Sequence, residues 1–279
     1  MYSINCKGKL LSFDEPLIMG IINATPDSFY RGYLPEGSDA ILALAGKMIS
    51  EGAGILDVGG QSTRPGSKRI STDEELQRVI PVITAIHLQY PGTVISVDTY
   101  SSVVAGAAVQ AGAVIVNDIS AGNMDSAMLP TVASLHVPYI CMHMQGTPET
   151  MQHQPVYEDV VKEVLDFFIE KTDACKKAGI RDIIIYPGFG FGKTIEHNFQ
   201  LLKGLAAFSI TGRPVLAGLS RKGTIYKTLG ITAGEALNGT TVMNTIALMN
   251  GASLLRVHDV KEAKETIQLY AAYKKAPRL

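Results

Sequence analysis

The stretch "QAGAVIVNDIS", residues 110–120, runs from a glycine through a short apolar segment to a polar pair. Glycine readily adopts the left-handed conformation in which many helices end. The apolar segment shows no alternation with polar residues, which is typical of a strand buried on both faces of a parallel sheet. The stretch therefore predicts the end of a helix, then a buried strand, then a polar strand terminus.

The same order of features recurs along the chain. It is found in "EGAGILDVG" (51–59), "KAGIRDIIIYPG" (177–188) and "NGASLLRVHD" (250–259), and more loosely in "LIMGIIN", "TVISVD", "PYICMH" and "PVLAGLS". The predicted strands lie near residues 18–23, 55–59, 94–98, 114–118, 139–143, 183–186, 215–219 and 254–258. Apolar residues at helical spacing separate them and predict intervening helices.

Alternating β and α units of this kind favour a (β/α)8 TIM barrel. No linker or composition shift marks a boundary, so we expect a single domain over residues 1–279 with its core at about 17–275. A doubly wound open sheet is the alternative. Its dinucleotide fingerprint is missing because Gly188, Gly190 and Gly192 are spaced G-x-G-x-G, and Pro187 stands where a P-loop needs glycine.

Charge and composition exclude several classes of partner. The chain has 25 Lys and Arg against 26 Asp and Glu, without the basic excess that nucleic acids or anionic membranes require. No apolar run approaches the roughly 20 residues of a membrane span, and the N-terminus does not resemble a signal peptide. The scattered cysteines fit a reducing compartment. We expect a cytoplasmic protein that binds neither nucleic acid nor membrane.

Polar residues close the predicted strands, at the end of a barrel where active sites lie. They are Asn23, Asp57, Asp98, Asn117, Asp118, His143, Tyr186, Ser220, Arg221, Lys222, Arg256 and His258. Because strand residues two apart share a face, Arg256 and His258 can point into the same mouth. Taken singly, Asp57 or Asp118 could cap the next helix, and His143 is more readily a core histidine than a ligand. Folding alone explains the whole ring poorly.

Two long loops follow the first two strands, "NATPDSFYRGY" (23–33) and "GGQSTRPGSKR" (59–69). Their cations are Arg31, Arg64, Lys68 and Arg69. Cations on such loops suit an anionic ligand, above all phosphate, although a solvated basic loop would also explain Lys68 and Arg69. Asn23 can offer a neutral oxygen to Mg²⁺, which takes few protein ligands beside water and phosphate. The residues predict an enzyme that acts on a phosphorylated small molecule without a covalent protein nucleophile.

Eight motifs, in order between Leu17 and Ala263, carry a family resemblance. They are "IMGIINATPDSF", "DVGGQSTRPGS", "SVDTY", "VNDISAG", "MHMQGTPETM", "PGFGFGKT", "LSRKG" and "LRVHDVKEA". Together they resemble the dihydropteroate synthase family of pterin-binding enzymes. The resemblance implies a homodimeric (β/α)8 transferase of folate biosynthesis. Such an enzyme joins 6-hydroxymethyl-7,8-dihydropterin diphosphate to p-aminobenzoate, releases pyrophosphate, and is inhibited by sulfonamides.

The resemblance also implies roles by position. For the diphosphate it implies Mg²⁺ held by Asn23 and contacts from Arg64 and His258, with Thr63 in the same substrate-binding loop. For the pterin it implies Asp98, Asn117, Tyr186, Lys222 and Arg256, and for the aminobenzoate Phe29, Pro65, Phe191 and Ser220, with Val257 in the same substrate site. Asp98, Lys222 and Arg256 are the implied catalytic residues. Breaking the C–O bond spreads positive charge into the pterin, which the Asp98 carboxylate can stabilise.

Tyr186 departs from the pattern that the resemblance implies, which has aspartate before PGFG. A carboxylate can accept from the pterin's ring N–H and exocyclic amine together, whereas a phenol with a pKa near ~10 is a single neutral acceptor. A hydrogen bond to a charged group contributes about 1.5–3 kcal/mol. We therefore expect pterin binding to be weakened by roughly 10- to 100-fold.

Two alternative functions stay open at this point. A non-catalytic or altered-specificity pterin-binding paralogue is suggested by Tyr186 alone. A pterin-dependent methyltransferase, which hands a methyl group to a corrinoid, would share the aspartate and asparagine contacts with the pterin. It would have no use for the "STRPG" and "SRK" segments, and this chain has both.

Overall fold

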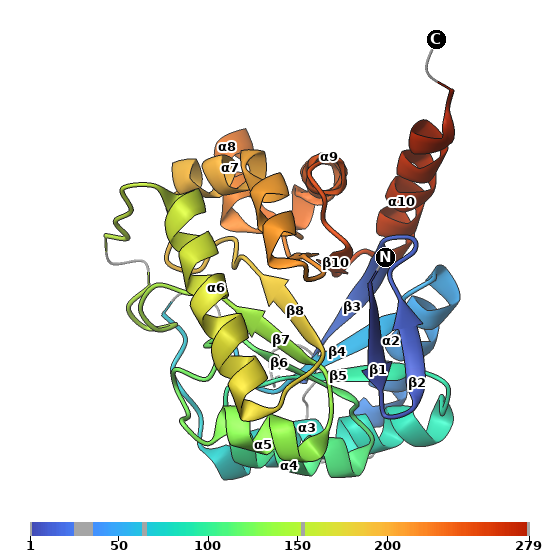
Figure 1. The fold of residues 1–279 in the computed structure, drawn as a ribbon. Coiled ribbons are helices and arrows are strands. Elements are labelled where there is room, and N and C mark those ends of the chain that lie inside the picture. Colours follow the sequence, from blue (N-terminus) through green and yellow to red (C-terminus); the bar gives the residue numbers. More distant parts are fainter. Residues whose placement is uncertain (1, 25–35, 63–65, 152–153, 278–279) are drawn as a thin grey trace.

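The structure is a computed structural model that describes residues 2–24, 36–62, 66–151 and 154–277. Its main sheet is parallel and has the strand order β8-β7-β6-β5-β4-β3-β10-β9. These strands are β3 (Leu17–Asn23), β4 (Ile55–Gly59), β5 (Val94–Asp98), β6 (Ile115–Asp118), β7 (Tyr139–Met142), β8 (Ile183–Tyr186), β9 (Leu216–Ala217) and β10 (Leu254–Val257). A bridge between Ile185 and Val215 joins the two edges. The result is a nearly closed barrel, which confirms the predicted (β/α)8 fold (Figure 1).

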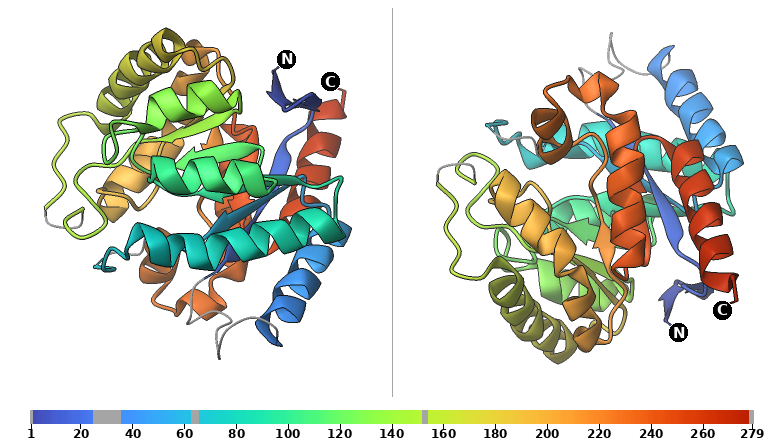
Figure 2. Two further views of the ribbon diagram at one scale, coloured as in Figure 1. Left: turned by 90° about the horizontal axis from the view of Figure 1, so that it is seen from below. Right: turned by 90° about the horizontal axis from the view of Figure 1, so that it is seen from above.

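Helices cover the outside of this barrel, as both views in Figure 2 show. They are α2 (Glu36–Glu51), α3 (Thr72–Gln89), α4 (Ser102–Ala111), α5 (Met128–Leu135), α6 (Val160–Ala178), α7 (Ile195–Lys203), α8 (Gly223–Leu229), α9 (Leu237–Met249) and α10 (Val260–Lys275). The 3-10 turns η1 (Leu205–Thr211) and η2 (Ala233–Glu235) lie before β9 and before α9. Gly112 and Gly179 end α4 and α6 with φ angles of 123° and 99°, as the sequence predicts.

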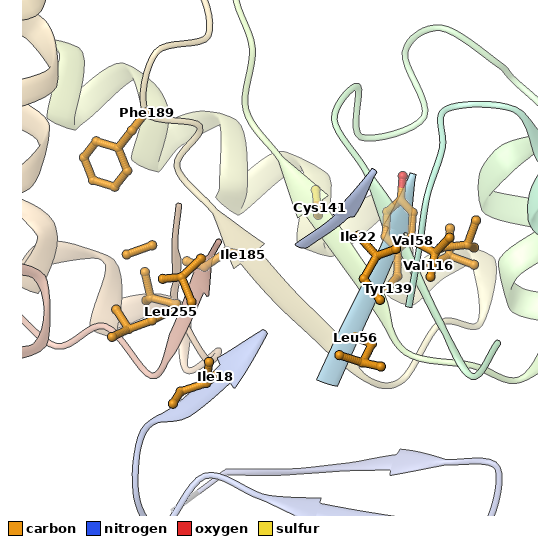
Figure 3. Packing of buried hydrophobic residues seen from close by; sticks show 14 of the residues in the cluster. Ile18, Ile22, Leu56, Val58, Val116, Tyr139, Cys141, Ile185, Phe189 and Leu255 are labelled. Atoms are coloured by element: carbon orange, nitrogen blue, oxygen red, sulfur yellow. The ribbon is translucent and has the colours of Figure 1, made fainter. Parts of the chain in front are cut away.

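Side chains alternate between two hydrophobic layers along each strand. In β10, Leu255 and Val257 join the layer between sheet and helices, part of which Figure 3 shows. Leu254 points the other way and belongs to the barrel interior with Ile55 and Val94. Because the side-chain period of a strand is two, the later inward positions of the same strands face the mouth of the barrel.

A hairpin of β1 (Ser3–Cys6) and β2 (Lys9–Ser12) precedes the barrel and was not predicted from the sequence. Its Ile4 and Cys6 pack with Val94 and Leu254, the first inward residues of their strands. The hairpin therefore covers the N-terminal end of the barrel. This cover leaves the C-terminal end as the open mouth, where the polar strand ends lie. Within the described ranges, every helix is too short or too polar to cross a membrane.

Candidate active site

One buried guanidinium links three strand ends at the C-terminal mouth. Arg256 of β10 donates from Nε to Asp57 Oδ2 at 2.6 Å and from Nη2 to Asp98 Oδ2 at 2.6 Å. Asn117 of β6 donates from Nδ2 to the same Asp57 oxygen at 3.0 Å. Asp57 and Asn117 are fully buried, and Asp98 is 9% exposed. Strands β4, β5, β6 and β10 thus contribute to one charged, hydrogen-bonded cluster.

Electrostatics in this cluster balance two carboxylates against one guanidinium. Burial raises the pKa of Asp98 to about 7, although the Arg256 charge acts in the opposite direction. Burial also opposes the charge of Arg256, but Asp57 and Asp98 raise the guanidinium pKa overall. Among the described residues, Asp57 Oδ1, Asn117 Oδ1 and Ser96 Oγ are buried without a hydrogen-bond partner. Buried acceptors without partners suit a ligand with several N–H donors.

Lys222 follows β9, the strand next to β10, and lies at the N-cap of α8. Its Nζ donates to the Phe189 carbonyl, lies 3.4 Å from the Tyr186 hydroxyl and lies 4.4 Å from the centre of the Phe191 ring. Burial, followed by the Arg256 charge, lowers the pKa of Lys222 well below its usual value. The site therefore offers an amine and a guanidinium from two neighbouring strand ends, those of β9 and β10.

Tyr186, the last residue of β8, points into the barrel interior and is 1% exposed. Burial raises the pKa of its phenol to about 12, so the side chain is neutral at pH 7. A Cβ at Gly218, the residue after β9, would overlap the phenolic oxygen. The Tyr186 ring therefore fits only because residue 218 is glycine.

The remaining rim of the mouth comes from β3 and from the segments after β9 and β10. Asn23 ends β3 and pairs in register with Gly59, which in turn pairs with Asp98. The Ser220 hydroxyl lies 3.0 Å from His258 Nδ1 and accepts the backbone N–H of His258 at 3.2 Å. The structure thus places Asn23, Ser220 and His258 at the same end of the barrel as the buried cluster.

Asn23 fits the ligand expected for Mg²⁺. Its side-chain amide is half-buried and has no hydrogen-bond partner among the described residues. The described part of the chain contains no group of three or more His, Cys, Asp or Glu residues that could hold a metal ion by itself. A single neutral oxygen such as that of Asn23 suits Mg²⁺, which takes most of its ligands from water and substrate phosphate.

The remaining predicted site residues are Val257, Phe191 and four residues that the structure does not describe. The side chain of Val257 is fully buried in the layer between sheet and helices, so it points away from the mouth of the barrel. Phe191 lies beside Lys222 in the interior layer. Four further predicted residues lie outside the described ranges: Phe29, Thr63, Arg64 and Pro65.

Sequence reasoning left Asp57 and Asp118 as equal candidates for helix caps, and the structure separates them. Asp118 accepts from the Tyr139 hydroxyl at 2.7 Å and from the Ser120 backbone N–H at 2.7 Å, so it holds the turn after β6. Asp57 instead points inward, two residues after the inward Ile55. That period-two alternation was the available signal that Asp57 belongs to the site.

The fold and this site define a class: a (β/α)8-barrel enzyme whose mouth presents buried hydrogen-bonding groups to a nitrogen-rich ligand. The family model for pterin binding enzymes matches residues 19–258. The chain belongs to that family.

Its relatives narrow the comparison further. The chain is 44% identical over 268 residues to the dihydropteroate synthase of Escherichia coli (strain K12), covering 95% of this chain and 94% of the relative. A structure of Xanthomonas albilineans dihydropteroate synthase with 4-aminobenzoic acid has a TM-score of 0.92, 41% identity and 99% coverage of both chains. Its complex with 7,8-dihydropteroate has a TM-score of 0.88, 39% identity, and coverage of 99% and 100%. The Yersinia pestis enzyme with a sulfonamide drug has a TM-score of 0.93, 38% identity, and coverage of 99% and 100%.

Proposed function

We infer that this chain catalyses dihydropteroate synthesis, joining 6-hydroxymethyl-7,8-dihydropterin diphosphate to p-aminobenzoate with release of pyrophosphate. The observation that carries the inference is the 44% identity, over 95% of the chain, to the Escherichia coli dihydropteroate synthase. The solved relatives that bind 4-aminobenzoic acid and 7,8-dihydropteroate support the same two substrates here.

The buried cluster can perform the binding step. The unpartnered oxygens of Asp57 and Asn117 can accept N–H groups of the pterin edge. Arg256 of β10 and Lys222, which follows the neighbouring β9, can both contact the ring. Water is excluded from this interior, which strengthens each of these charge-assisted contacts.

In the transfer step the amine nitrogen of p-aminobenzoate attacks the pterin methylene carbon as the bond to the diphosphate oxygen breaks. The electron pair of that bond leaves with pyrophosphate, and the amine releases one proton. Positive charge that develops on the pterin lies near the Asp98 carboxylate, which can stabilise it electrostatically. When bound at Asn23, Mg²⁺ would supply charge neutralisation for the leaving diphosphate. No step needs a covalent bond to the protein.

Pyrophosphate release is the direct test of this function. We would mix the chain with both substrates and Mg²⁺, measure pyrophosphate, and repeat the assay with a sulfonamide. Release that needs both substrates, and that the sulfonamide inhibits in competition with p-aminobenzoate, supports the synthase. Pterin binding without release would favour the non-catalytic paralogue, and a methyl transfer to a corrinoid would favour the methyltransferase.

The Asp98 carboxyl predicts a pH dependence of pterin binding. Burial raises its pKa to about 7, so the carboxylate that accepts the pterin N–H is lost as the pH falls through that value. We expect the Kd of 6-hydroxymethyl-7,8-dihydropterin, which lacks the titrating diphosphate, to rise by up to about tenfold per pH unit below 7. Fluorescence titration from pH 5.5 to 8.5 measures it. The Asp98→Asn variant should bind weakly without this dependence, and an equal slope in both proteins would contradict the assignment.

We propose a homodimer, supported by an exposed apolar face on α9 and α10. These helices pack against each other and lie side by side in Figure 2. Val242 and Met249 of α9 are 51% and 60% exposed, and Leu269 and Tyr273 of α10 are 73% and 68% exposed. Large apolar patches on a protein surface mark association sites.

The charge-introducing change Met249→Lys is therefore expected to shift the chain toward monomer. Sedimentation velocity on wild type and variant would measure the change. The matched control is Ile210→Lys, at a residue 75% exposed in η1 and remote in sequence from α9 and α10. A dimer that survives Met249→Lys and dissociates with the control variant would place the interface elsewhere.

We also propose a cytoplasmic location, which the free thiols of Cys6, Cys141 and Cys175 support.

A further inference from the structure

A second buried polar cluster lies behind the substrate site, at the end of the loop Pro187–Gly192. Lys193 is 2% exposed. Its Nζ lies 2.9 Å from His143 Nδ1 and donates to the carbonyls of Gly188 and Phe191 at 3.1 Å each. A lysine ammonium has three N–H donors, and these three acceptors match them. The lysine is thus bonded near the start and near the end of its own loop and to the residue after β7.

His143 acts in this cluster as an acceptor. Burial, followed by the Lys193 charge, lowers the pKa of the imidazole to about 2, so the ring is neutral and its Nδ1 can accept a hydrogen bond from Lys193. The ring packs at 4.8 Å edge-on against Phe167. His143 is therefore a buried core histidine, as the sequence favoured, but one with a specific polar partner. Burial lowers the pKa of Lys193 to about 7, while its acceptors favour the charged form.

The loop approaches the neighbouring strand end so closely that side chains are excluded. A Cβ at Gly188 would overlap the His143 carbonyl, and one at Gly192 would overlap the Gln145 carbonyl. Both glycines have positive φ angles, 73° and 60°, which residues other than glycine rarely adopt. The glycines therefore permit the fold of the loop. Hydrogen bonds then hold the loop in place: the Gly192 carbonyl accepts from the Tyr157 hydroxyl at 2.9 Å, and Lys193 donates to the Gly188 and Phe191 carbonyls.

The other side of the same loop faces the substrate site. The Phe189 carbonyl accepts from Lys222, and the Phe191 ring lies 4.4 Å from the Lys222 amine. Phe191 thus touches both lysines, with its carbonyl on Lys193 and its ring beside Lys222. A shift of this loop would move the two groups that hold Lys222 in place.

We propose that Lys193 is a positioning residue for Lys222, which it holds in the substrate site by clamping the Pro187–Gly192 loop against His143. Lys193 itself touches no substrate. The catalytic part of the proposal rests on the proposed function, but the clamp does not. A role in stability alone would be filled better by an apolar side chain, because burying an ammonium opposes folding.

Hydrogen exchange tests the clamp without any substrate. In Lys193→Met, which keeps the length and loses the donors, we expect the amides of Gly190 and Phe191 to exchange faster by roughly tenfold to a hundredfold. These amides donate to Asn198 Oδ1 at 2.7 Å and to the Gly188 carbonyl at 3.1 Å in the intact loop. The amide of Ile185 in β8, bonded to Pro214, should keep its rate. The control is Lys203→Met at the exposed end of α7.

Pterin binding and turnover test the effect on Lys222. Lys193→Met should weaken binding of 6-hydroxymethyl-7,8-dihydropterin and lower kcat/KM for pyrophosphate release by a similar factor, per folded molecule. If that variant fails to fold, His143→Leu is the alternative, because it removes only one of the three acceptors and should also speed loop exchange. His143→Gln supplies an amide oxygen as acceptor and should return the exchange rates to those of the wild type. Unchanged loop exchange, or faster exchange spread evenly over all strands, would overturn the clamp. Faster loop exchange with unchanged pterin binding would overturn the link to Lys222. Loop exchange that follows the expectation while wild type releases no pyrophosphate would reject the synthase function and leave the clamp intact.

Discussion

Arg256→Met is expected to reduce kcat/KM for pyrophosphate release by roughly 10- to 100-fold, because a hydrogen bond from a charged group to the substrate contributes about 1.5–3 kcal/mol. The guanidinium is bonded to two carboxylates that are nearly or fully buried, Asp57 and Asp98. Its removal takes away a proposed substrate contact and leaves both carboxylates without their cation. Steady-state kinetics of pyrophosphate release measure the effect.

The same variant should lose stability in a pH-dependent manner. The pKa of Asp98 is already raised by burial, and without Arg256 it rises further above its unfolded value. The folded variant then binds more protons than the unfolded chain, so its stability increases as the pH falls and decreases as the pH rises through the folded pKa.

Urea unfolding at pH 6 and pH 8 would measure this difference. The Lys162→Met variant is the control, since Lys162 pairs with Asp166 on the exposed face of α6 and should leave the pH dependence unchanged. Equal losses of stability at both pH values for Arg256→Met would show that the pKa of the buried carboxyls does not depend on the Arg256 charge.

The barrel was predictable because each strand repeats one local pattern, and local patterns do not depend on distant residues. The predicted strand near 94–98 matches β5, whereas the one near 215–219 is reduced to the pair Leu216–Ala217 in β9. The β1–β2 hairpin was missed because its strands have four residues each and lack a long apolar run. Short, half-exposed strands carry little periodic signal.

The site was predictable as a set of strand ends but not as a set of contacts. Period-two alternation places Arg256 at the mouth, yet its partner Asp57 is 199 positions away in the sequence. Which strand ends meet depends on the closure of the barrel, because closure brings β10 beside β3. The pairing of Lys193 with His143 was missed for the same reason. Both residues lie at loop positions whose separation in space is set by the neighbouring strands β7 and β8.

Tyr186→Asp is expected to tighten pterin binding by roughly 10- to 100-fold, because a carboxylate accepts two N–H groups and gains a charged hydrogen bond. The structure provides for the new charge: Lys222 Nζ lies 3.4 Å from the present phenolic oxygen, and the neighbouring Arg256 charge also acts on this position. We would measure the Kd of 6-hydroxymethyl-7,8-dihydropterin and the KM of its diphosphate. Tyr186→Phe is the matched control, since it keeps the ring and should bring no gain. Unchanged or weaker pterin binding in Tyr186→Asp would show that residue 186 does not contact the pterin as assigned.

Gly218→Ala tests whether the Tyr186 ring fills the space beside Gly218. The added methyl group would overlap the Tyr186 hydroxyl, so in the wild-type background it must displace the buried ring or the β9 backbone. Overpacking of this kind typically costs about 1–3 kcal/mol. In the Tyr186→Asp background the phenol is absent, so the same change should cost much less, and the two substitutions should be strongly non-additive. Chemical unfolding of the four proteins measures the coupling. Additive losses would mean that the phenol does not fill the space beside Gly218.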